Sequence, residues 1–175
     1  MANKWVAFFS QTGAEICDIA ESLDRWPDVI VTNARPAALR TIDERLKDKK
    51  VVILPNKPQP MHYNTVCKES SVVTLHGWLR VVPPTVCEKF TIFNGHPGLI
   101  TKYPELKGKD PQVKAHKLGH EVAGAVIHKV TAGVDEGRII MEEYFNATQL
   151  DLDDLFRILR DRSLYMWSNL LKQVL

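Results

Sequence analysis

Short, mostly apolar runs without alternation recur along the first half of the chain, separated by other segments. The runs are residues 5–9, 29–32, 51–54, 72–75 and 91–94. Apolar runs of this kind are typical of strands that are covered on both faces. Between them, helical spacing of Ile16, Ile19 and Leu23 predicts a helix over 13–23, and Pro36 precedes a second one over 37–46. This alternation predicts right-handed crossovers and a mostly parallel sheet.

The pattern changes after residue 94. A helix is expected over 110–118, and two strands close in sequence, 123–130 and 138–144, predict an antiparallel extension. The run Thr148-Gln149-Leu150-Asp151 is similar to a capping box with Asp in place of Glu, and it precedes a long last helix with an apolar stripe. We therefore expect a single doubly wound, Rossmann-like α/β domain over residues 1–175, with a C-terminal antiparallel extension.

Composition narrows the class of protein. A chain of 175 residues with 45% hydrophobic and 25% charged residues suits one globular domain and argues against disorder. A formal net charge of +2 gives no field that would attract nucleic acid, so we expect no nucleic-acid partner. The basic stretch 102–117 also contains Glu105 and Asp110, which makes it a mixed-charge, solvated face.

The chain has three cysteines, at separated positions and without a C-x-x-C spacing. This pattern indicates neither a disulfide framework nor a zinc site, and it favours reduced thiols in the cytoplasm. The apolar segment 5–9 is too short for a membrane span and lacks the form of a secretory signal, so no membrane partner is expected. His116 and His120 have helical i, i+4 spacing, but no third metal ligand accompanies them, and no metal is expected.

Three segments that follow strands, 10–15, 77–82 and 94–99, are expected at the carboxyl edge of the sheet, where ligands of open α/β sheets bind. The last one carries Asn94 and His96, and the turn 133–137 carries Asp135. An amide, an imidazole and a carboxylate together suit polarisation of a small carbonyl, a charged tetrahedral intermediate and a proton transfer. The structural alternatives are an Asn-Gly turn, a buried histidine and a turn aspartate.

Several blocks between Leu75 and Ile140 occur in the order and spacing of one enzyme family. They are His76-Gly77-Trp78-Leu79-Arg80-Val81-Val82, Asn94-Gly95-His96-Pro97-Gly98-Leu99-Ile100, Gly124-Ala125-Val126-Ile127-His128-Lys129-Val130 and Asp135-Glu136-Gly137-Arg138-Ile139-Ile140. This stretch resembles folate-dependent formyltransferases, most closely the glycinamide ribonucleotide transformylases. The first half matches more weakly, mainly through residues 9–13 and 31–33.

The resemblance implies transfer of a formyl group from 10-formyltetrahydrofolate, as co-substrate, to a primary amine of a small acceptor, without a metal. Asn94 and His96 would donate hydrogen bonds to the oxyanion of the intermediate. Asp135 would favour the protonated form of His96 and take the proton of the attacking amine, directly or through a water. His128 aligns with a family histidine and is expected to support the site.

The resemblance also assigns binding residues for the folate. The backbone of Arg80 and Val82 would read the edge of the pterin, and Trp78 and Leu79 would shape its wall. The segment 131–135, with Thr131 and Val134, would close over the ring. Alternatively, Trp78 and Leu79 are plain core residues, and Arg80 pairs with the glutamate tail of the folate or lies in solvent.

The acceptor side departs from the family pattern. The family holds a substrate phosphate on a Gly-x-Gly-Ser-Asn run at a helix start, and here the run is Gln11-Thr12-Gly13-Ala14-Glu15. The candidate acceptor-binding residues are Thr12, Gly13, Ala14, Glu15 and Arg160. The Glu15 carboxylate would repel a phosphate, and Ser163 replaces a family glutamate that touches the ribose. Glycinamide ribonucleotide is the family default, with an amino sugar or a modified nucleotide as its competitor.

Two other functions remain open. Formyltetrahydrofolate deformylases use a similar triad with water as the nucleophile, and a non-catalytic folate- or nucleotide-binding module would use none of it. Deformylases usually carry a further N-terminal domain and methionyl-tRNA formyltransferases a further C-terminal one, and 175 residues are expected to leave no room for either. The protein is expected to act as a monomer or a homodimer.

Overall fold

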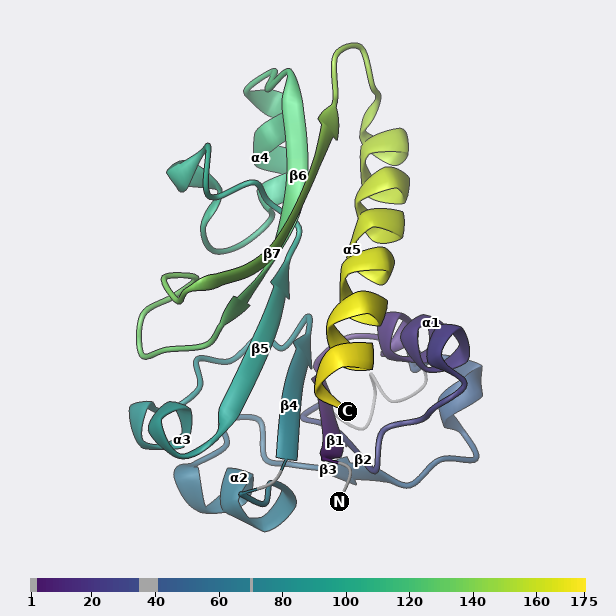
Figure 1. Cartoon of the computed structure of the whole chain (residues 1–175), viewed down its shortest axis with the longest axis vertical. Coiled ribbons are helices and arrows are strands. Elements are labelled where there is room, and N and C mark those ends of the chain that lie inside the picture. Colours follow the sequence, from purple (N-terminus) through teal and green to yellow (C-terminus); the bar gives the residue numbers. More distant parts are fainter. Residues whose placement is uncertain (1–2, 35–40, 70) are drawn as a thin grey trace.

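A computed structural model describes residues 3–34, 41–69 and 71–175. Its seven strands form one sheet in the order β3-β2-β1-β4-β5-β6-β7 (Figure 1). The strands are β1 (Lys4–Phe9), β2 (Val29–Thr32), β3 (Val51–Ile53), β4 (Ser71–His76), β5 (Thr91–His96), β6 (Val122–Lys129) and β7 (Ile139–Asn146). The first five are parallel, and β6 and β7 join as antiparallel neighbours. The fold class expected from the hydrophobic pattern is confirmed.

Helices cover both faces of the sheet. The α-helices are α1 (Ala14–Leu23), α2 (Pro60–Val66), α3 (Pro84–Lys89), α4 (Pro111–Lys117) and α5 (Leu152–Val174), and short 3₁₀ helices span Glu44–Leu46 and Pro104–Leu106. Helix α5 runs along the sheet, and the carboxyl-terminal part of α5 lies beside α1 (Figure 1). None of the helices in the described ranges has the length and apolarity that a membrane span needs.

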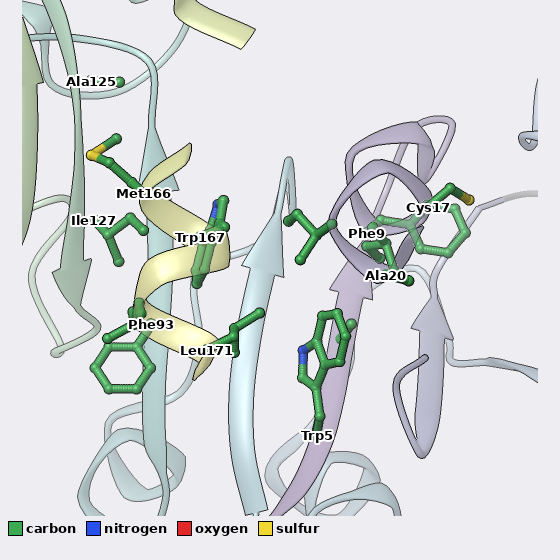
Figure 2. Packing of buried hydrophobic residues seen from close by; sticks show 14 of the residues in the cluster. Trp5, Phe9, Cys17, Ala20, Phe93, Ala125, Ile127, Met166, Trp167 and Leu171 are labelled. Atoms are coloured by element: carbon green, nitrogen blue, oxygen red, sulfur yellow. The ribbon is translucent and has the colours of Figure 1, made fainter. Parts of the chain in front are cut away.

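The larger core cluster joins α1 and α5 to the sheet. Trp5 and Phe9 of β1, Cys17 and Ala20 of α1, and Trp167 of α5 are all fully buried there. Figure 2 shows Trp167 and Leu171 of α5 reaching toward the strands, with Trp5 and Phe9 farther along the sheet. A second cluster, around Phe8, Tyr63 and Ile92, fills the opposite face under α2 and α3. Burying both faces explains why the strands lack alternation.

The register between neighbouring strands determines where the carboxyl ends of β1, β4 and β5 lie. Phe9 lies opposite His76, and Leu75 lies opposite Asn94. The ends of β1, β4 and β5 therefore come to one edge of the sheet, as the sequence predicts. Asn94 and His96 lie at the end of β5 itself, whereas the other candidate residues on this edge lie in the segments that follow β1 and β4.

Two helix predictions were wrong in detail. Of the helix expected over 37–46, residues 37–40 lie outside the described part. Residues 41–46 form no α-helix and include the 3₁₀ turn Glu44–Leu46, which Asp43 caps by accepting from Arg45 N. The cap of the last helix is Asp151, three residues later than the predicted cap Thr148. Asp151 accepts from Asp154 N at 2.8 Å, while Thr148 N donates to Asn146 Oδ1 in the preceding turn.

Helices α2 and α3 were not predicted. They have seven and six residues, too few for a clear helical periodicity. Both begin with a proline in the first turn, Pro60 and Pro84, where a missing N–H costs nothing. These prolines were the signal available in the sequence.

Candidate active site

The structure brings Asn94, His96 and Asp135 together. Asn94 and His96 alternate on β5, so their side chains leave the same face of the sheet. Asp135 comes from the turn between β6 and β7, in the left-handed region with φ 52°. Its Oδ1 lies 3.5 Å from Asn94 Nδ2, and its Oδ2 lies 3.4 Å from His96 Nδ1. The expected meeting of amide, imidazole and carboxylate is thus present.

Further donors hold the Asp135 carboxylate. Gly108 N donates to Oδ2 at 2.9 Å, and His128 Nε2 lies 3.2 Å from Oδ1. Burial alone would raise the pKa of Asp135, but the hydrogen bonds from His128 and Gly108 and the nearby imidazoles lower it to about 2. Asp135 is therefore ionised at neutral pH and can accept a proton or orient a cation.

His96 is 6% exposed, and both of its ring nitrogens face protein groups. Nε2 lies 2.8 Å from the Leu106 carbonyl oxygen, which can only accept, so Nε2 carries the proton. Burial lowers the pKa of His96, and the Asp135 charge opposes this without reversing it. Asp135 favours the protonated imidazole, as expected, but the desolvation of the ring outweighs this ion pair, so the pKa of His96 stays below its ordinary value.

His128 contacts two members of this group, Asn94 and Asp135. It pairs with Asn94 across β5 and β6, and its Nε2 lies 3.3 Å from Asn94 Nδ2. Its Nδ1 lies 3.1 Å from the Lys129 carbonyl oxygen. His128 is buried and contacts Asn94 and Asp135 directly, which fits the supporting place that the sequence gave it.

The residues expected to bind folate divide into buried and exposed ones. Trp78 is buried, donates to the Tyr63 hydroxyl at 3.2 Å and packs edge-on against Phe8, so its side chain belongs to the core. Val82 is buried as well. Leu79 is 51% exposed, and its backbone N–H donates to Ser10 Oγ at 3.0 Å.

The Arg80 side chain is held by backbone oxygens of its own neighbourhood. Its Nε donates to the Asn56 carbonyl at 2.5 Å and its Nη1 to the Leu79 carbonyl at 2.7 Å. In the segment opposite, Thr131 and Val134 are exposed. Leu79 and Val134 are thus apolar side chains left open on the loops that flank the site.

The loop before α1 is shaped by Gly13. Gly13 has φ 73°, and a Cβ there would lie 2.6 Å from Leu46 Cδ1, so only glycine fits. Thr12 Oγ1 accepts from Ala14 N at 3.3 Å. The carboxylate of Glu15, one residue further on, lies between two other side chains of the fold.

Glu15 is bound by residues distant in sequence. His76 Nδ1 lies 2.9 Å from its Oε2, and Ser163 Oγ donates to its Oε1 at 2.5 Å. Sequence reasoning singled out Glu15 and Ser163 separately but gave His76 no role. A histidine at the last position of β4, opposite Phe9, was the signal that could have found it. Arg160 instead binds Asp18, with its Nε 3.0 Å from Oδ2.

Two cavities lie away from the candidate catalytic residues. One of about 750 Å³ is formed over β6 and β7 by residues that include Leu99, Lys102 and Tyr144. Another of about 270 Å³ lies by His116, His120 and Leu155. Neither is lined by the candidate catalytic residues. Within the described ranges, no group of three or more His, Cys, Asp or Glu residues is arranged to hold a metal ion.

The topology and the amide–imidazole–carboxylate group define a Rossmann-like α/β protein with a candidate acyl-transfer site. A family model described as "Formyl transferase" matches residues 46–163, and the chain belongs to that family. In sequence it is 30% identical over 96 residues to a phosphoribosylglycinamide formyltransferase of Bacillus subtilis, covering 54% of this chain and 46% of the relative. It is 33% identical over 92 residues to a formyltetrahydrofolate deformylase of Synechocystis sp., covering 51% of this chain and 31% of the relative.

Solved structures show the same fold. A phosphoribosylglycinamide formyltransferase from Campylobacter jejuni superposes with a TM-score of 0.84 at 21% identity, covering 99% of this chain and 98% of that one. A formyltetrahydrofolate deformylase from Pseudomonas syringae gives 0.75 at 18% identity, covering 99% of this chain and 62% of that one. The sequence matches to the two curated relatives span less than half of each relative's length.

Proposed function

We propose that the protein transfers a formyl group from 10-formyltetrahydrofolate to the primary amine of a small, sugar- or nucleotide-like acceptor. The main support is that Asn94, His96 and Asp135 meet at the carboxyl end of β5. The Asp135 carboxylate lies 3.5 Å from Asn94 Nδ2 and 3.4 Å from His96 Nδ1. Membership of the formyl transferase family supports it. We place the enzyme in the cytoplasm, as a monomer or a homodimer.

The chemistry follows from the donors and the base. The amine nitrogen attacks the formyl carbon, a C–N bond forms, and the carbonyl oxygen becomes an oxyanion. The Asn94 amide and His96 Nε2–H donate to that oxygen. Asp135, ionised because of its donors, takes the proton of the amine, directly or through a water. The proton then reaches the folate nitrogen as its bond to the formyl carbon breaks.

The contact between His96 and Leu106 has a consequence for this step. His96 Nε2 lies 2.8 Å from the Leu106 carbonyl oxygen, so its N–H must exchange that oxygen for the oxygen of the substrate. Asp135 also accepts from Gly108 N in the same segment. Substrate binding therefore involves the segment 104–109 together with the catalytic group.

We assign the folate and the acceptor to loops that lie near the candidate catalytic residues. We assign the folate to the backbone of Arg80 and Val82, the side chain of Leu79, and the segment with Thr131 and Val134. Trp78 supports this wall from the core through Tyr63 and Phe8. The acceptor is assigned to Thr12, Gly13, Ala14 and Glu15, with Arg160 nearby on α5.

Hydrolysis of the same formyl donor is the second candidate. The similarity to the deformylase of Synechocystis sp. favours it, since water could replace the amine at the same carbon. Release of formate from 10-formyltetrahydrofolate, measured with and without candidate amines, separates the two. Transfer predicts an N-formyl product that appears only with an amine, while hydrolysis predicts formate whether or not an amine is present.

Substitution of the two donors tests the catalytic assignment. We expect Asn94→Ala and His96→Ala each to reduce formyl transfer at least about a hundredfold, because each removes a hydrogen bond to the oxyanion. His116→Ala, which removes an exposed histidine of α4, is the control and should leave the rate unchanged. Unreduced transfer by either catalytic variant on every tested amine would contradict the assignment. A folded wild-type protein that neither transfers nor releases the formyl group would be a binding module.

A further inference from the structure

Polar residues connect the carboxyl ends of β1, β2 and β3, which are neighbours in the sheet. Ser10 follows β1 and Asn33 follows β2, and the Ser10 hydroxyl donates to Asn33 Oδ1 at 2.8 Å. Asn33 Nδ2 donates to the carbonyl oxygen of Asn56, in the segment after β3, at 3.3 Å. Because that carbonyl oxygen can only accept, it fixes the orientation of the Asn33 amide.

The same residues hold the segment after β4 at two adjacent positions. Leu79 N donates to Ser10 Oγ at 3.0 Å, so the Ser10 hydroxyl both donates and accepts. Arg80 Nε donates to the Asn56 carbonyl oxygen at 2.5 Å, and its Nη2 donates to Asn56 Oδ1. The hydrogen bonds therefore close into a ring that begins at Leu79 and ends at Arg80. We call the four side chains of this ring, Ser10, Asn33, Asn56 and Arg80, the loop clamp.

The clamp joins a buried amide to an exposed loop. Asn33 is 6% exposed, and a buried amide that loses its partners costs free energy, so the ring favours its closed form. Leu79 and Val81 are 51% and 68% exposed, whereas Trp78 between β4 and Leu79 is buried. The backbone around the two exposed side chains is therefore held by Trp78 from below and by the clamp from the side.

The Arg80 side chain is turned back onto the protein. Three of its five N–H groups donate to protein oxygens, two of them to Asn56 and one to the Leu79 carbonyl oxygen. Because both Asn56 acceptors meet one planar guanidinium, they hold it in a single orientation. A carboxylate that drew this side chain outward would have to replace all three hydrogen bonds. Arg80 is thus arranged to hold its own loop.

The clamped loop lies beside the strand that carries the catalytic group. Leu75 of β4 pairs with Asn94 of β5, so the chain leaves β4 next to the end of β5. The pterin is assigned above to the backbone of Arg80 and Val82. Backbone groups that are fixed before a ligand arrives bind it more tightly, because no free energy is spent on ordering them.

We propose that Ser10, Asn33 and Asn56 are positioning residues for the folate, because they fix the backbone that recognises the pterin through Leu79 N and the Arg80 guanidinium. The Arg80 side chain belongs to this clamp and does not bind the glutamate tail. This inference rests on the proposed function, since it concerns the folate-binding loop assigned there.

Binding calorimetry with folic acid and pteroic acid tests the clamp. The two compounds share the pterin, and pteroic acid lacks the glutamate. We expect Ser10→Ala and Asn56→Ala each to weaken the binding of both compounds at least about threefold, because each substitution removes a hydrogen bond of the clamp. Arg80→Gln should weaken the binding of both compounds by the same factor, because the clamp acts on the part that they share.

Two matched substitutions remove the same groups elsewhere. Ser22→Ala removes a partly buried hydroxyl that lies 3.0 Å from Ser168 Oγ. Asn64→Ala removes an amide oxygen that accepts from Lys89 Nζ at 3.0 Å, as the Asn56 oxygen accepts from Arg80. Both variants should bind the two compounds with the affinity of the wild type.

Two further measurements separate positioning from general stability. Hydrogen exchange needs no ligand, and the Leu79 amide should exchange at least about threefold faster in Ser10→Ala than in the wild type. In formyl transfer, Ser10→Ala should raise KM for 10-formyltetrahydrofolate at least about threefold, while kcat stays within about twofold, because the clamp acts on binding of the folate.

Several outcomes overturn the clamp. They are unchanged affinity of Ser10→Ala for both compounds, equal effects of Ser10→Ala and Ser22→Ala, and binding of folic acid alone by the wild type. A loss by Arg80→Gln that is confined to folic acid would show that Arg80 binds the glutamate tail. If Ser10→Ala does not fold, as judged by its thermal unfolding, Asn56→Ala must weaken both compounds and raise the same KM.

The clamp and the proposed function fail in different ways. A wild-type protein that binds neither compound, but whose Leu79 amide exchanges faster in Ser10→Ala, would contradict only the proposed function. A protein that binds folic acid and transfers the formyl group, with the affinity and the Leu79 exchange unchanged in Ser10→Ala, would contradict only the clamp.

Discussion

At the scale of single residues, Gly95 links the catalytic strand to α5. It lies between Asn94 and His96 on β5, and its Cα faces the indole of the buried Trp167. A Cβ there would be 2.8 Å from Nε1 and 3.2 Å from Cε2 of that ring. Real Cβ atoms do not approach so closely, so the strand must keep a glycine to hold both neighbours in place.

We expect Gly95→Ala to lower the free energy of unfolding by about 1–3 kcal/mol, because the methyl group overpacks a rigid part of the core. Denaturant unfolding measures this. In a Trp167→Phe background the smaller ring gives way, and the cost of Gly95→Ala should fall by about 1 kcal/mol. Strict additivity of the two substitutions would show that the indole is not the cause.

At the scale of elements, α5 contacts α1 and β5 near the residues that we assign to the acceptor. Its Ser163 contacts Glu15, its Arg160 contacts Asp18, and its Trp167 packs against Gly95 of β5. Its start is set by Asp151, whose side chain accepts from Asp154 N. Asp153 and Asp154 add negative charge in the first turn, which suits the helix dipole. The cap thus helps to fix the position of the helix residues that make these three contacts.

The cap assignment can be measured with a matched pair. Asp151→Ala should cost about 1 kcal/mol of stability, because it leaves a helix N–H without its acceptor. Thr148→Ala should change stability by less than about 0.5 kcal/mol, since Thr148 lies in the turn before the helix. A larger loss at Thr148 than at Asp151 would restore the capping box that the sequence pattern suggested.

At the scale of the whole molecule, the candidate site makes stability depend on pH. The pKa of Asp135 is lowered to about 2, below its unfolded value of about 3.9, so its contribution is present above about pH 4 and is lost as the pH falls toward about 2. The pKa of His96 is lowered by burial, so the unfolded chain binds a proton more readily than the folded one. Stability should therefore fall as the pH drops below about 6.5.

Unfolding by urea at a series of pH values tests both groups. Between about pH 7 and 5, we expect His96→Gln to lose less stability than the wild type, while His116→Gln follows the wild type. Between about pH 4 and 2, the wild type should lose up to about 2 kcal/mol of its free energy of unfolding, and Asp135→Asn should not show this loss. Parallel curves for wild type and His96→Gln would mean that His96 is not held neutral by burial.

Local patterns in the sequence determined much of this protein. The strands and the long last helix follow from apolar runs and spacing; for the central strands the reason is that burial on both faces requires continuous hydrophobicity. Asn94, His96 and Asp135 were recognisable from motif blocks, and the parallel order of β1, β4 and β5 implied that their ends meet. Helices α2 and α3 escaped because six or seven residues carry little periodicity.

Tertiary structure alone decided which groups touch and how they are charged. The contacts of Glu15 with His76 and Ser163 join three elements far apart in sequence, and no spacing encodes them. No sequence pattern indicates that Arg160 binds Asp18 or that the Trp78 side chain is enclosed in the core. The protonation of His96 depends on its burial, which is a property of the packed molecule. Local sequence sets the backbone and its periodicity, whereas contact and solvent exposure arise only when distant segments pack.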